Sequence, residues 1–92
     1  MSDMSESSNE SMGVRVDITL DCAPGGPRPG DLLPGILAGT GIVLGAPISK
    51  FFGAWTWAVP ADQVALYRQH ESLIGERITE LYNSGRIRYA DW

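Results

Sequence analysis

The sequence predicts an α+β fold, with a small antiparallel or mixed sheet of about three strands and one short and one long helix on one face. Two patterns support this prediction. Three short segments alternate apolar and polar residues, as strands with one buried face do. One longer segment repeats its apolar residues every three to four positions, as an amphipathic helix does. A chain of 92 residues, 43% of them hydrophobic, has room for one modest core, so we expect a single domain over residues 13–92.

The three predicted strands cover residues 13–20, 54–59 and 86–90, each bounded by glycine or proline. The second strand places Trp55 and Trp57 on one side, which predicts that both tryptophans lie in the core. A loop rich in proline and glycine follows the first strand at residues 22–30.

The first and last predicted strands carry complementary charges. If the two strands are antiparallel neighbours, Arg86 and Arg88 lie across from Asp17 and Asp21. The expected sheet therefore joins the two ends of the folded segment.

The short helix is predicted over residues 32–38, with Asp31 as its N-cap and Pro34 in its first turn. The long helix covers residues 60–84, and Gly85 follows in the position of a left-handed cap. Its apolar stripe is formed by Val64, Tyr67, Ile74, Ile78, Leu81 and Tyr82.

The segment between these helices is harder to interpret. Residues 40–47 fit either a short buried strand or irregular chain, since glycine and proline interrupt them. Residues 49–52 are interpreted as one helical turn before Gly53.

Residues 1–12 predict a disordered acidic tail. They contain five serines, three acids and no base, and so hold three of the four net negative charges. We interpret the tail as a solubilising leader; an acidic interaction arm or a cluster of phosphorylation sites is the alternative. The start has no basic residue and no apolar stretch of a secretory signal, and the chain has one cysteine, which favours a cytoplasmic location.

Composition argues against several kinds of chemistry. One cysteine and one histidine exclude an internal disulfide and the common zinc motifs, so we expect no metal and no cofactor. The glycines of residues 35–45 do not have the spacing of a dinucleotide fingerprint, and no P-loop lysine follows them. These glycines are therefore interpreted as turn and packing positions.

A catalytic group is not expected either. His70 and Glu71 are adjacent on a predicted helix and so point about a hundred degrees apart, and Cys22 has no base beside it in the sequence, although its loop could expose it. We expect His70 at the edge of the core and Glu71 as a buried or half-buried carboxylate paired with an arginine. Three arginines are candidates for that pair: Arg15, Arg77 and Arg88.

The aromatic residues carry the leading functional prediction. Three tryptophans, three tyrosines and two phenylalanines exceed what so small a core can bury. We expect a non-enzymatic protein that binds another protein, or itself, through partly exposed rings. The candidate partner-binding residues are Phe51, Phe52, Tyr89 and Trp92.

Two alternatives come from other patterns. The end of the chain resembles winged-helix domains, whose recognition helix leads into a wing, over about fourteen residues that include Ile74, Ile78, Leu81, Gly85 and Ile87. That resemblance implies a nucleic-acid-binding module, but Glu76 and Glu80 on the exposed helix face oppose phosphate contacts. Residues 32–49 contain no charge and are a candidate membrane segment, which their prolines and glycines disfavour.

Overall fold

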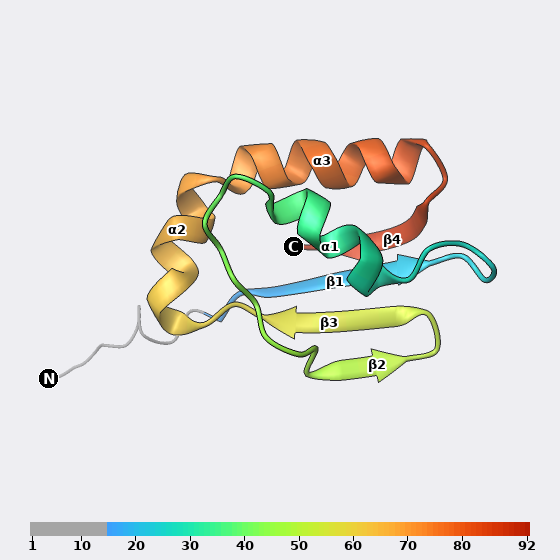
Figure 1. Cartoon of the computed structure of the whole chain (residues 1–92), viewed down its shortest axis with the longest axis horizontal. Coiled ribbons are helices and arrows are strands. Elements are labelled where there is room, and N and C mark those ends of the chain that lie inside the picture. Colours follow the sequence, from blue (N-terminus) through green and yellow to red (C-terminus); the bar gives the residue numbers. More distant parts are fainter. Residues whose placement is uncertain (1–14) are drawn as a thin grey trace, which may run out of the picture.

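The alternating segment near the start of the chain forms strand β1 (Asp17–Cys22), in which every second side chain is buried. The computed structural model describes residues 15–92 and has an α+β fold (Figure 1). The predicted alternation is confirmed, but β1 begins at Asp17 and ends at Cys22 instead of covering residues 13–20, so residues 15 and 16 precede the strand. Residues 13 and 14, like the predicted tail over residues 1–12, lie outside the described residues.

The sheet has four strands rather than about three. Its order is β2 (Ser49–Phe51), β3 (Ala54–Ala58), β1 and β4 (Ile87–Asp91), and all neighbours are antiparallel. Because one helical segment joins β1 to β2 and another joins β3 to β4, the connectivity is the split β-α-β topology of ferredoxin-like domains. Helices cover one face of the sheet, and no helix of residues 15–92 covers the other (Figure 1).

Helix α1 (Pro29–Leu37) begins earlier than predicted, because Arg28 and not Asp31 is its N-cap. The Asp31 carboxylate still has a capping role, since its Oδ2 accepts the main-chain N–H of Arg28 at 3.2 Å. Pro34 consequently lies inside the helix rather than in its first turn. The helix ends before Gly39, whose φ of +79° is a left-handed conformation suited to glycine.

Residues 41–48 form no regular element. The chain is nevertheless held in place, because the Gln63 side chain accepts the main-chain N–H of Val43 at 2.7 Å and donates to its carbonyl at 2.8 Å. The helical turn predicted over residues 49–52 is wrong: residues 49–51 form edge strand β2, and Phe52 and Gly53 turn the chain into β3.

The candidate membrane segment, residues 32–49, is divided among α1, irregular chain and the first residue of β2. No helix within residues 15–92 is both long enough and apolar enough to cross a bilayer.

The predicted single helix over residues 60–84 is divided in the structure. A 3-10 turn η2 (Ala61–Gln63) leads into α2 (Val64–Gln69), and α3 (Glu71–Asn83) follows after a break at His70. An unbroken helix of that length would extend about 37 Å, whereas a strand like β1 spans about 20 Å. The bend lets α2 fold over the end of the sheet (Figure 1), where Tyr67 is fully buried.

The end of α3 confirms the predicted glycine cap. Gly85 has a φ of +83°, and its N–H bonds to the Tyr82 carbonyl at 3.1 Å. The N–H of Arg86 bonds to the Leu81 carbonyl at 3.0 Å, which completes a Schellman motif.

Of the charge pairs predicted between β1 and β4, the one between Arg88 and Asp21 is confirmed and the one that involves Asp17 is wrong. Arg88 Nε lies 3.2 Å from Asp21 Oδ1, as expected. Asp17 instead pairs with Arg15 at 3.0 Å, because the last paired residue of β4 lies opposite Thr19 and the register stops short of Asp17. Arg86 precedes β4 and is exposed.

The core lies between the sheet and the helices. Trp57 is buried, as predicted, but Trp55 is only partly buried, and Tyr82 is exposed rather than on the buried stripe. The buried hydrophobic residues are Val16, Ile18, Leu20, Cys22, Leu33, Ile36, Leu37, Ile42, Trp57, Val59, Tyr67, Ile74, Ile78 and Ile87.

Candidate functional site

The turn between β2 and β3 has an unusual conformation. Phe51 pairs with Ala54, so Phe52 and Gly53 form a two-residue turn, and both turn types that suit such hairpins need a positive φ at the first position. Phe52 accordingly has a φ of 56°, which is strained for a bulky residue. Glycine is required at position 53 because the backbone there lies close to β1: a Cβ would lie 2.7 Å from the Cys22 carbonyl oxygen.

Both phenylalanines of this hairpin are at the surface. Phe51 is 67% exposed and Phe52 is 88% exposed. Their rings form an edge-to-face pair with centroids 4.5 Å apart. Two adjacent exposed rings, one on a strained backbone, form an apolar tip on the molecule.

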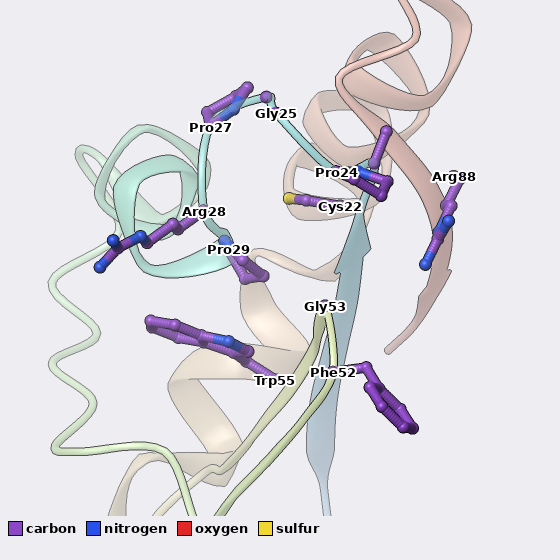
Figure 2. A pocket seen from close by; sticks show the side chains of 12 residues that line it. Cys22, Pro24, Gly25, Pro27, Arg28, Pro29, Phe52, Gly53, Trp55 and Arg88 are labelled. Atoms are coloured by element: carbon purple, nitrogen blue, oxygen red, sulfur yellow. The ribbon is translucent and has the colours of Figure 1, made fainter.

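A pocket of about 720 Å³ opens beside this tip (Figure 2). We call it the proline-loop pocket, because residues 22–29 form much of its wall, and Phe52, Gly53, Trp55 and Arg88 complete it. Figure 2 shows Arg28 and Arg88 on opposite sides of the pocket, with Trp55 across from the loop. The lining residues include two arginines and no acidic residue.

Trp55 is held between two neighbours. The Lys50 Nζ lies over its ring, 4.2 Å from the centroid, as a cation–π contact. Gly30 at the start of α1 packs so closely on the six-membered ring that a Cβ there would lie 2.8 Å from it. The tryptophan therefore connects the strands to the helix and contributes an apolar surface to the pocket.

A second group of exposed rings lies at the other edge of the sheet. Tyr82 of α3 and Tyr89 of β4 border an apolar groove of about 280 Å³, together with Trp92. Trp92 lies against α3 at Gly75, where a Cβ would lie 3.2 Å from its indole nitrogen. The three rings are about half exposed.

All four predicted partner-binding residues are thus at the surface, but the structure does not bring them together. Phe51 and Phe52 lie at the β2 edge, and Tyr89 and Trp92 lie at or just beyond the β4 edge, three strand spacings or roughly 14 Å away. Arg28 and Trp55 line the pocket and were not predicted from the sequence. The density of proline in residues 22–30 was the available signal, because it predicts a stiff loop able to line a site.

Cys22, His70 and Glu71 do not form a catalytic group, because each is buried or held by another contact. Cys22 is buried, contrary to the exposure that its loop suggested, and burial raises the pKa of its thiol. Glu71 is partly buried and pairs with an arginine, as predicted, but its partner is Arg68 at 3.1 Å. The three candidates Arg15, Arg77 and Arg88 are wrong. His70 is partly buried at the helix break, with Nδ1 3.1 Å from the Leu66 carbonyl oxygen.

Arg77, one of those candidates, has a structural contact instead. Its Nη1 donates to the carbonyl oxygens of Ile36 at 3.0 Å and Ala38 at 2.6 Å, at the end of α1. Within residues 15–92 no group of three histidine, cysteine or acidic residues is arranged to hold a metal ion.

Tyr67 is the one buried side chain of the described residues whose polar atom has no hydrogen-bond partner among them. The side chain is fully buried, and burial raises the pKa of its hydroxyl. The adjacent carboxylate of Glu71 acts in the same direction, while Arg68 opposes it.

The chain matches no model of a protein family, no curated protein and no solved structure.

Proposed function

We propose that this chain is a small protein-binding module that docks its partner through the aromatic residues of the β2–β3 hairpin. The single observation that carries the proposal is the conformation of Phe52, which is 88% exposed at a φ of 56°. A large apolar side chain in water contributes little to folding, and a left-handed backbone at such a residue costs about 1–3 kcal/mol. Binding another molecule is the benefit that offsets such a cost.

The neighbouring features support a binding role over a catalytic one. The Cys22 thiol is buried and its pKa is raised, so it is a poor nucleophile. Glu71 is engaged by Arg68, and His70 lies against a main-chain carbonyl. Exposed aromatic rings beside an apolar pocket are typical of protein interfaces.

The nucleic-acid alternative has weaker support. Four-stranded sheets that bind single-stranded RNA stack bases on aromatic residues of their open face. Here the central strands turn Trp55 and Trp57 toward the helices, and Asp17, Thr19 and Asp21 alternate with the buried residues of β1. Glu76 and Glu80 are exposed on α3, where a recognition helix would need basic residues.

The proposal is tested by photo-crosslinking in the cells that express the protein. A benzophenone amino acid replaces Phe51 in the full chain, and a matched chain carries it in place of Glu76, which is exposed on α3. We expect a discrete crosslinked protein, or a crosslinked second copy, from position 51 only. The purified partner should then bind the Phe51→Ala variant at least about tenfold more weakly. Equal crosslinking from both positions, or none from position 51, would refute the proposal.

A further inference from the structure

We infer that the proline-loop pocket binds an acidic peptide segment of the partner, with one apolar side chain inserted between the loop and Trp55. This inference rests on the proposed protein-binding function and adds the chemistry of the partner. It follows from the size of the pocket, its walls and its charge, which point to the same kind of occupant.

The size and walls of the pocket suit an inserted side chain with its flanking main chain. The volume of about 720 Å³ is within the range of ligand sites in proteins. Trp55 supplies aromatic surface, and Pro24, Pro27 and Pro29 supply rigid apolar surface that loses little entropy on binding. An apolar anchor from the partner would be enclosed by these residues.

The charge at the pocket is opposite in sign to that of the chain. The chain has a net charge of −4, yet Arg28 and Arg88 line the pocket and Lys50 lies over Trp55 at its edge. Two carboxylates lie nearby. Asp21 pairs with Arg88 Nε at 3.2 Å and so offsets that arginine, and Asp31 accepts the main-chain N–H of Arg28 at 3.2 Å. The three cations against these two carboxylates leave a local excess of positive charge, which favours carboxylates on an incoming segment.

A peptide fits this arrangement better than a nucleic acid. The cations here are few, whereas nucleic-acid affinity depends on neutralising many phosphates. An acidic segment with one apolar side chain needs fewer cations than a nucleic acid does. The pocket offers both arginines and apolar walls for such a segment.

The experiment uses the full chain and fluorescently labelled short peptides in a polarisation assay. The acidic probe has one phenylalanine flanked on each side by two glutamates, and the matched probes replace every glutamate with glutamine or with lysine. We expect the acidic probe to bind at least about tenfold more tightly than either matched probe, with an affinity that falls as salt is added.

Variants of the chain locate the site. Arg28→Glu and the milder Arg28→Gln should weaken binding of the acidic probe, by about tenfold or more for the charge reversal. Arg86→Glu changes the net charge equally at an exposed position outside the pocket, and it should leave the affinity within about twofold. Circular dichroism of each variant checks that the fold is retained.

The contrary outcomes are distinct. Equal binding of the three probes, no binding of any, or equal effects of the Arg28 and Arg86 variants would overturn the inference. Tighter binding of oligouridine than of the acidic peptide, weakened by Arg28→Glu, would replace the peptide with a nucleic acid. If crosslinking from position 51 still captures a partner in those cases, the protein-binding function stands and only the acidic segment is wrong.

Discussion

Among single residues, Phe52 allows the proposed binding role and its effect on stability to be tested together. Replacing it with glycine should raise the free energy of unfolding by about 1 kcal/mol, because glycine adopts a φ of 56° without strain and the lost side chain is 88% exposed. The same variant should bind the partner more weakly. Urea unfolding, followed by tryptophan fluorescence, measures the first effect.

The adjacent glycine provides the control for that prediction. Gly53→Ala should destabilise the fold by about 2 kcal/mol, because its Cβ would lie 2.7 Å from the Cys22 carbonyl oxygen and 3.0 Å from Asp21 Oδ1. If Phe52→Gly instead lowers stability, then Phe52 supports the fold and its exposure is no argument for binding.

Residue exposure could be predicted from composition, whereas residue conformation could not. The surplus of aromatic rings predicts that some lie at the surface, and Phe51, Phe52, Tyr89 and Trp92 all do. The left-handed backbone of Phe52 follows from the two-residue turn between Phe51 and Ala54, which requires a positive φ at its first position. The sequence does not mark this position with the glycine or asparagine usual there, so its pattern predicts a helical turn instead.

For the helices and strands, the link between α1 and α3 depends on Arg77. Arg77→Met should lower the free energy of unfolding by about 2 kcal/mol, because two carbonyl oxygens at the end of α1 lose a charged donor. Arg68→Met removes an exposed i,i+3 pair with Glu71 and should change stability by less than about 0.5 kcal/mol. Equal losses in urea unfolding would show that Arg77 acts only as a surface charge.

The cap of α3 gives a second test among the elements. Gly85→Ala should cost about 1 kcal/mol, since alanine is strained at a φ of +83° and no atom lies near enough for its methyl group to gain contacts. Ser84→Ala is a suitable comparison at the preceding position. Thermal unfolding of the two variants distinguishes backbone strain from a general effect on this turn, because strain predicts the larger loss for Gly85→Ala.

The elements also restrict how a partner can bind. Edge strand β2 has three residues with Lys50 at its centre, and β4 has a register shift opposite Asp21 and Cys22. Short strands, lysine and bulges all oppose the addition of another strand to an edge. We therefore expect partners to contact side chains of the hairpin and pocket rather than to extend the sheet.

Periodicity predicted the type of most elements but not their extent. The apolar stripe of residues 60–84 correctly indicated helix, and it placed Tyr67, Ile74 and Ile78 in the core. The break at His70 depends on the length of the sheet that the helix must cover, which is a property of the assembled fold. For the same reason Tyr82, on the same stripe, extends beyond the core and is exposed.

In the whole molecule, the distribution of charge matters more than its total. Of the four net negative charges, three come from residues 1–12, and the remainder of the chain is near neutral. Within that remainder, arginines gather at the proline-loop pocket, a grouping that needs the turn of β2–β3 beside the loop after β1. Net charge alone could therefore not reveal the candidate site.

Two buried ionisable groups of the core, Tyr67 and Cys22, should make the folded chain less stable at alkaline pH. Burial raises the pKa of both Tyr67 and Cys22, so the folded chain keeps them neutral where the unfolded chain ionises. Below the ordinary pKa values, about 9 to 10, both groups are neutral in the folded and the unfolded chain, and their contribution to the free energy of unfolding is complete. As the pH rises through these values toward the higher ones of the folded state, the unfolded chain ionises first and that contribution is lost. Tyr67→Phe removes one of the two groups.

This variant should be as stable as the wild type or about 1 kcal/mol more stable at pH 7, because the buried hydroxyl has no partner among residues 15–92. The stability of the variant should also fall less between about pH 9 and 11, since only Cys22 then contributes. Urea unfolding at several pH values measures both effects. A large loss of stability at pH 7 would mean that the hydroxyl is hydrogen-bonded in solution, and an equal alkaline loss in both proteins would mean that Tyr67 does not govern it.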